Sequence, residues 1–253
     1  NPSSIFPYQT LGWLYMQRGH WTARYRQEGG VFATVSSGIS KVRDLFGRPE
    51  SNYIELGVDS FHAALFLSEE ESIEKANLVQ NLGEAYYELE NFQKALLYLG
   101  ERISLSKTHP FADKNVEASV LRLGGRSAFQ IEEYELAESL QRKSLEIWQS
   151  QANDAQIAYS LEALALTLRE QKKYKEAIAT YNQLIIRQKA KQQSAQISKT
   201  LSNLGYCYYM SDDYVNALEN FQESIRKIEG KPETSATQEE RAIAVDLGGE
   251  ASK

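Results

Sequence analysis

Apolar residues recur along this chain at the spacing of α-helices that come in pairs. The first clear stripe falls at i, i+3, i+4 and i+7 and consists of Val79, Leu82, Gly83 and Tyr86. It predicts a helix over about residues 73–89. Two polar residues follow, and a second apolar stripe begins at Phe92. This part of the chain is therefore expected to form a helix–turn–helix hairpin.

The same arrangement returns three more times. A small residue is followed nine positions later by an aromatic residue and three positions after that by alanine. The small residues are Gly83, Gly125, Ala165 and Gly205, the aromatic residues are Phe92, Tyr134, Tyr174 and Tyr214, and the alanines are Ala95, Ala137, Ala177 and Ala217. The spacings are 42, 40 and 40 residues. A fixed period of this length indicates stacked units, none of which can bury its apolar face alone.

The small residues have a packing reason. Glycine inside a helix costs about 1 kcal/mol relative to alanine. Three glycines at one register therefore predict that the two helices of each hairpin approach closely there. We expect an all-α protein whose core is a row of small interfaces.

The amino-terminal part continues the register less clearly. An opening hairpin after Pro7 is predicted from Tyr8, Leu11, Gly12, Tyr15, Gly19 and Trp21. Phe61 and Ala64 again have the expected offset, but Gly47, Pro49 and Gly57 interrupt the helix that should precede them. We therefore expect irregular or shifted helices at about residues 29–57.

The carboxyl-terminal part leaves the repeat. A polar stretch after Ile228 ends the last hairpin, and Thr237 with the acidic residues that follow resembles a helix start. We predict a repeat solenoid over residues 1–230 and a linker with a C-terminal capping helix over residues 231–253.

The composition restricts the kinds of partner and the cellular compartment that we expect for this protein. The net charge of −6 comes from 28 basic and 34 acidic residues, which is too mild and too mixed for a protein that binds nucleic acid or an anionic membrane. Neither a signal peptide nor a membrane-spanning run of apolar residues is present in the sequence, and we expect a cytoplasmic protein. Because the chain begins at Asn1, we expect it to be part of a larger polypeptide.

Catalytic and metal-binding patterns are weak. The histidines, His20, His62 and His109, are far apart in a linear array, and the single cysteine, Cys207, lies inside an apolar helix. A cysteine hydrolase would need a base within hydrogen-bond reach of Cys207, so a buried structural cysteine is the favoured interpretation. No histidine or cysteine pair has metal-ligand spacing. We predict no enzyme, no metal and no cofactor.

These repeats resemble the tetratricopeptide repeat family. The opening copy follows the family pattern of Leu-Gly, tyrosine, turn glycine and aromatic residue, and the last copy does so with Leu204, Gly205, Tyr208, Tyr214 and Ala217. The period is longer than the usual ~34 residues, a style similar to kinesin light chain and to bacterial adaptor and regulator modules. The resemblance implies a right-handed superhelical solenoid of about five to six hairpins with a capping helix.

The resemblance also implies a binding site on the first helix of each hairpin, which lines a concave groove that receives an extended peptide or a partner helix. The outward stripe of these helices supplies the candidate binding residues. They are Asn81, Tyr87, Arg122, Arg126, Phe129, Arg169, Asn203, Tyr206 and Tyr209.

The candidate residues have plausible roles and plain alternatives. The asparagines could bond a peptide backbone, and the three arginines could converge on a carboxylate or phosphate. The alternatives are a solvated arginine face or pairing with Glu162, and aromatic residues that only pack between hairpins. The lysine–asparagine clamp of chaperone-binding members is not reproduced.

We therefore expect a module that binds a protein or peptide segment in its groove. The alternative is the sensor or scaffold domain of a larger signalling or regulatory protein that responds to a bound peptide.

Overall fold

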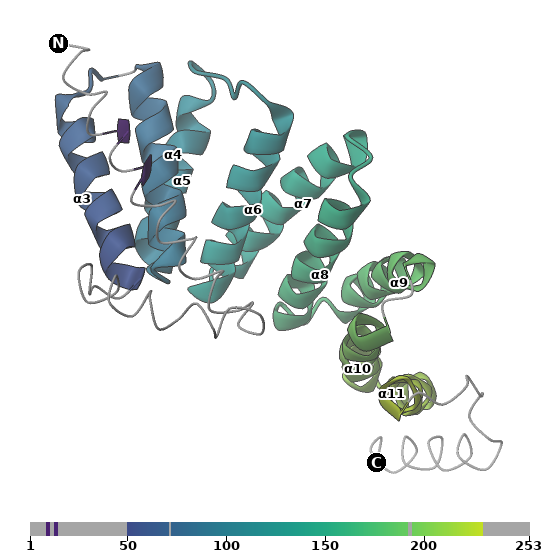
Figure 1. Ribbon diagram of the computed structural model, residues 1–253. Helices are drawn as coiled ribbons and strands as arrows, with labels where there is room; N and C mark the ends of the chain where they lie inside the picture. Colours follow the sequence, from purple (N-terminus) through teal and green to yellow (C-terminus); the bar gives the residue numbers. More distant parts are fainter. Residues whose placement is uncertain (1–8, 11–12, 15–49, 71, 192–193, 230–253) are drawn as a thin grey trace. The chain divides into compact units, whose positions relative to one another are not determined.

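The structure is a computed structural model that describes residues 9–10, 13–14, 50–70, 72–191 and 194–229 (Figure 1). From residue 50 to residue 229 the described residues form helices and no strand. The helices are α3 (Glu50–Leu67), α4 (Ile73–Glu88), α5 (Phe92–Leu105), α6 (Lys114–Gln130), α7 (Tyr134–Ser150), α8 (Asp154–Glu170), α9 (Tyr174–Ala190), α10 (Ser194–Tyr209) and α11 (Tyr214–Glu229). The all-α class is confirmed.

The helices pair as the repeat predicts. The four hairpins are α4/α5, α6/α7, α8/α9 and α10/α11, and each second helix begins at the aromatic residue of the repeat. Helices α7 to α11 each pack against the next, and α4 packs against both α3 and α5. The chain divides into two compact units, Asn1–Val116 and Glu117–Lys253. Each unit has a buried apolar cluster of its own.

The cluster of the second unit is built from the stripes that the sequence shows. It includes Leu161, Leu164 and Leu168 of α8 and the fully buried Tyr181 of α9. The cluster of the first unit is formed by apolar residues of α3, α4 and α5, among them Phe61. Apolar burial of this kind is the main favourable term for folding.

Close helix contact explains the glycines. A Cβ atom built on Gly83 would lie 2.6 Å from Cγ of Leu99, and one on Gly125 would lie 2.9 Å from Cγ of Gln141. A Cβ on Gly205 would lie 2.9 Å from the Phe221 ring. No side chain fits at these distances without displacement of its neighbour, so the predicted close approach is confirmed in three hairpins.

The turn inside each hairpin has one residue in the left-handed conformation. These residues are Glu90, Glu132, Lys172 and Asp212, with φ angles of 57°, 65°, 61° and 62°. Each lies seven positions after the small residue of its repeat. The amide of the following residue donates to the carbonyl five positions earlier, as in the bond from Glu133 to Ala128 at 2.9 Å. This bond satisfies a carbonyl that the helix end would otherwise leave unpaired.

Helix α3 differs from the prediction. It runs from Glu50 to Leu67 without a break, so the irregularity expected around Gly57 is not found for residues 50–57. Ile54, Val58 and Phe61 are buried in the apolar cluster with α4, and this burial outweighs the roughly 1 kcal/mol that a helical glycine costs. Three predictions lie outside the described residues. They concern residues 29–49, the capping helix, and the opening hairpin, of which only residues 9–10 and 13–14 are described, as helical.

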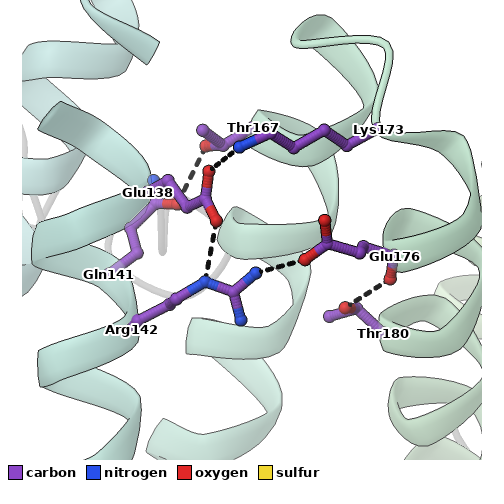
Figure 2. Close-up of polar contacts among 7 residues, drawn as sticks. All are labelled: Glu138, Gln141, Arg142, Thr167, Lys173, Glu176 and Thr180. Atoms are coloured by element: carbon purple, nitrogen blue, oxygen red, sulfur yellow. Dashed lines mark hydrogen bonds and ion pairs between the residues drawn. The ribbon is translucent and has the colours of Figure 1, made fainter. Parts of the chain in front are cut away.

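A network of polar side chains ties α7 to the hairpin that follows it (Figure 2). Glu138 of α7 accepts from Nε of Arg142 at 2.8 Å and from Nζ of Lys173 at 2.7 Å, and Arg142 also pairs with Glu176 of α9 at 2.7 Å. Burial alone would raise the pKa of Glu138, but the hydrogen bonds from Lys173 and Arg142 lower it below its usual range. The carboxylate therefore stays charged and holds two repeats in register.

A buried hydrogen bond lies beside this network. Thr167 donates its hydroxyl to Oε1 of Gln141 at 2.8 Å, and both side chains are almost fully buried. Gln141 stands at the position that Phe221 holds in the last repeat. Its contact with Gly125 and its bond to Thr167 show close packing there.

Candidate functional site

The predicted binding residues lie on the first helices of the hairpins. In the first unit, α4 carries Asn81 and Tyr87. In the second unit, α6, α8 and α10 carry the rest. Side chains three or four positions apart lie on the same face of a helix. The predicted binding residues therefore share a face outside the apolar stripe.

Two arginines of α6 meet a tyrosine of α8. The guanidinium groups of Arg122 and Arg126 each lie 5.4 Å from the centroid of the Tyr159 ring. Arg126 also donates a hydrogen bond to the Tyr159 hydroxyl. Tyr159 remains 40% exposed. Arg122 and Arg126 therefore gather at one aromatic side chain that solvent can reach.

The third arginine has other partners. Arg169 donates from Nη1 to Oδ1 of Asn203 at 2.8 Å, and its guanidinium lies 5.6 Å from the centroid of the Tyr206 ring. It also forms an ion pair with Glu170, at 3.0 Å from Nε and 2.6 Å from Nη2. Arg169 thus connects α8 to two of the candidate residues on α10, Asn203 and Tyr206.

Three of the aromatic candidates pack inside their own hairpins. Each lies five positions before the first aromatic residue of the second helix and contacts it edge to face. The pairs are Tyr87 with Phe92, Phe129 with Tyr134 and Tyr209 with Tyr214, at centroid distances of 5.7, 5.6 and 5.5 Å. Such pairs stabilise the turn end of the hairpin. This agrees with the packing interpretation for these three residues, although Tyr209 is also 51% exposed.

The remaining candidates and alternatives are placed as follows. Asn81 is half-buried on α4. Glu162, which we considered as a partner for the arginines, forms an ion pair with Lys199 of α10 at 2.8 Å. The side chains that gather in the second unit are Arg122, Arg126, Tyr159, Arg169, Asn203 and Tyr206, and we refer to them as the arginine–tyrosine face.

Residues outside this face show no catalytic arrangement in the described part of the chain. Cys207 is fully buried, and burial raises the pKa of its thiol to about 11. A cysteine nucleophile needs the opposite, an exposed thiol with a lowered pKa. His62 donates to or accepts from the Tyr86 hydroxyl at 3.0 Å. Among the described residues, no group of three or more potential metal ligands occurs, and none of the helices has the length and apolar content needed to cross a bilayer.

Sequence reasoning missed two contributors to the site. Tyr159 lies on the outward stripe, but its offset from the small residue gave no sign that both arginines would contact it. Lys172 lies with Lys173 in the turn between α8 and α9, and two adjacent lysines do not show which one is paired. The signal that could have found Lys172 is the replacement, in the third repeat alone, of an aromatic residue by Arg169 five positions before Tyr174.

Comparison with known proteins agrees with this fold. Residues 117–190 match the family model of the tetratricopeptide repeat. No curated protein sequence matches the chain. One similar structure is a Podosopora anserina putative kinesin light chain with nearly identical TPR-like repeats, at 13% identity and a TM-score of 0.60 over 91% of this chain and 97% of that one.

Two further structures have similar folds. BtubC (BKLC) from P. vanneervenii has 16% identity and a TM-score of 0.58 over 92% of this chain and 96% of that one. MamA has 15% identity and a TM-score of 0.56 over 71% of this chain and 91% of that one. At such identities the likeness establishes the fold.

The family match and the fold agree with each other. Tetratricopeptide repeats generally serve as non-catalytic scaffolds for protein–protein interaction. Residues 117–190 match that family's model, and the described helices around them have the fold of its solenoids.

Proposed function

We propose that the arginine–tyrosine face binds an extended peptide or a protein segment. The observation that carries this proposal is the gathering of Arg122 and Arg126 around the partly exposed Tyr159. An exposed aromatic ring next to two guanidinium groups can contact an apolar side chain and an anionic group of the same segment. Aromatic residues and arginine are also the types that contribute most to protein interfaces.

The charge of the face favours an acidic segment. Its basic side chains come from α6 and α8, whereas Glu162 is paired with Lys199 and Glu170 with Arg169. The chain as a whole carries a net charge of −6, whereas this face has three arginines on α6 and α8. Such a local field speeds the encounter with a partner of opposite charge and selects against others.

The test needs a ligand and a pair of matched variants. Twelve-residue peptides are selected by display on the whole chain, and a selected peptide is synthesised with a fluorescent label. Its dissociation constant is measured by fluorescence anisotropy for the wild type and for Arg122→Glu/Arg126→Glu. We expect the variant to bind at least tenfold more weakly, because two charge-assisted contacts are lost and two repulsions are introduced.

The control reverses the same number of charges elsewhere in the second unit. Lys143 of α7 and Lys175 of α9 are exposed. Lys143→Glu/Lys175→Glu should bind the peptide within about twofold of the wild type, and circular dichroism should show unchanged helicity in both double variants. Equal affinity of the wild type and Arg122→Glu/Arg126→Glu would rule out this face as the binding site.

A further inference from the structure

The third hairpin lacks an aromatic contact that the other three described hairpins share. In those three, an aromatic residue at the end of the first helix packs edge to face on the aromatic residue that starts the second helix. In the third hairpin the first member is Arg169 and the second is Tyr174. The side chain that would fill the turn end of this hairpin is therefore replaced by one that extends toward α10.

A cavity lies at this place. Its volume is about 280 Å³, and it is lined by Arg169, Glu170, Lys172, Tyr174 and Tyr206. Pockets for small-molecule ligands and cofactors usually measure about 300–1,000 Å³. The cavity is slightly smaller than that range, which suits one amino-acid side chain better than a cofactor. Tyr206 is 43% exposed, so solvent reaches one wall.

Arg169 is already bonded to two residues of the protein itself. Glu170 accepts from its Nε and Nη2, and Asn203 accepts from its Nη1. The guanidinium therefore forms a neutralised wall of the cavity. Both bonds to Glu170 end on its Oε1, so this carboxylate is ion-paired and is not left as an unpaired negative charge.

Lys172 supplies the positive charge that remains. It lies in the turn between α8 and α9 with φ of 61°, and its side chain is exposed. No carboxylate in the described part of the chain pairs with it. Its neighbour Lys173 has the opposite role, because it pairs with Glu138 in the network of Figure 2. The turn thus directs one lysine to the preceding repeat and leaves the other at the cavity.

We propose that this cavity receives one carboxylate side chain, aspartate or glutamate, from the segment that binds along the arginine–tyrosine face. The proposal rests on the proposed function and adds a specific acidic position to it. Lys172 pairs with the carboxylate, and the rings of Tyr174 and Tyr206 pack against its aliphatic stem. The bound side chain thereby fills the space that an aromatic side chain occupies in the other hairpins.

The experiment is a double-mutant cycle, in which changes in the peptide are combined with a change in the protein. A peptide selected by display on the whole chain is resynthesised with each acidic residue changed singly to its amide. Dissociation constants are measured for the wild type and for Lys172→Glu. Glutamate occupies the same turn position in two other hairpins, at Glu90 and Glu132, so this variant is expected to fold.

We expect one acidic position whose change to the amide weakens binding to the wild type about tenfold, as loss of a charge-assisted hydrogen bond would. Against Lys172→Glu, the same change should leave binding equal or improve it. Lys175→Glu, a matched charge reversal on α9, should behave like the wild type.

Three results would overturn the proposal. One is that every amide-substituted peptide loses the same factor against the wild type and Lys172→Glu. Another is that a phosphoserine at the sensitive position binds more than tenfold better than the carboxylate, which would make the cavity a phosphate site. The third is that no acidic position matters at all. If Arg122→Glu/Arg126→Glu also binds normally, the proposed function fails; if that variant loses binding, only the cavity assignment fails.

Discussion

At the scale of single residues, one turn position of the repeat takes the same left-handed backbone conformation with different residue types. The left-handed turn position holds glutamate, lysine or aspartate in the four described hairpins, whereas the predicted opening hairpin has Gly19 there. A residue with a Cβ atom pays about 1–2 kcal/mol in this conformation. The described hairpins therefore carry a cost at each turn that glycine would remove.

This cost gives a first prediction. Glu132→Gly should raise the free energy of unfolding by about 1 kcal/mol, because glycine adopts φ of 65° without the clash of a Cβ atom. Glu135→Gly, three residues later inside α7, should lower it by about 1 kcal/mol since glycine is unfavourable in a helix. Urea unfolding followed by circular dichroism measures both. A loss of stability in Glu132→Gly would contradict the account of the turn.

The buried glycines give a second prediction with its own control. Gly83→Ala should destabilise the chain by about 1–3 kcal/mol, because the new methyl group meets the buried side chain and the backbone amide of Leu99. Gly100 of α5 has open space where a Cβ would stand, so Gly100→Ala should stabilise the chain by about 1 kcal/mol. The thermal midpoints of the two variants should move in opposite directions. Movement in the same direction would show that helix propensity, not packing, determines the effect at Gly83.

At the scale of helices and hairpins, the sequence predicted what depends on local pattern. The α4 helix was expected over about residues 73–89 and spans Ile73–Glu88, and all four hairpins were identified. Helix α3 was missed because Gly57 and Pro49 read as breaks. Its buried residues Ile54, Val58 and Phe61 do fall at i, i+4 and i+7, but only their packing against α4 shows that this stripe outweighs the glycine.

The candidate site was predicted less completely for the same reason. The register placed Arg122 and Arg126 on one face, but their convergence on Tyr159 depends on how far α6 and α8 are offset along their axes. Likewise, Arg169 was identified, but its bonds to Glu170 and Asn203 depend on side-chain rotamers. Only the structure shows that Lys172 is the cation left at the cavity.

The network between α7 and α9 gives a third prediction at this scale. The pKa of Glu138 is lowered by its two cationic partners, so its contribution to stability is present above the usual carboxyl pKa near 4.5 and is lost as the pH falls through the lower value of the folded state. Glu138→Gln should therefore be less stable than the wild type by about 1 kcal/mol at pH 7.

The measurement is a series of urea midpoints between pH 7 and pH 3. The difference between the wild type and Glu138→Gln should shrink as the acid protonates Glu138. Added salt should reduce it too, because Arg142, Lys173 and Glu176 are partly exposed. A difference that stays constant with pH would mean that Glu138 contributes through packing alone.

At the scale of the whole molecule, the described helices α7 to α11 pack successively along the chain. Such an array is stabilised by local interfaces and presents a surface shared by several repeats, which suits the recognition of another chain. In the second unit, the second helices hold the repeats together through Glu138 and Arg142, whereas the first helices carry the arginine–tyrosine face. First helices bridge repeats too, as the ion pair of Glu162 with Lys199 does, so the binding face alone separates the two kinds of helix.

This separation leads to the central claim, that the first helices of the second unit bind the partner. Backbone hydrogen exchange of the whole chain, measured with and without a saturating display-selected peptide, tests it most directly. We predict slower exchange in α6, α8 and α10 and unchanged exchange in α7 and α9. Protection confined to α7 and α9, or the same exchange in all five helices with the peptide bound, would contradict the claim.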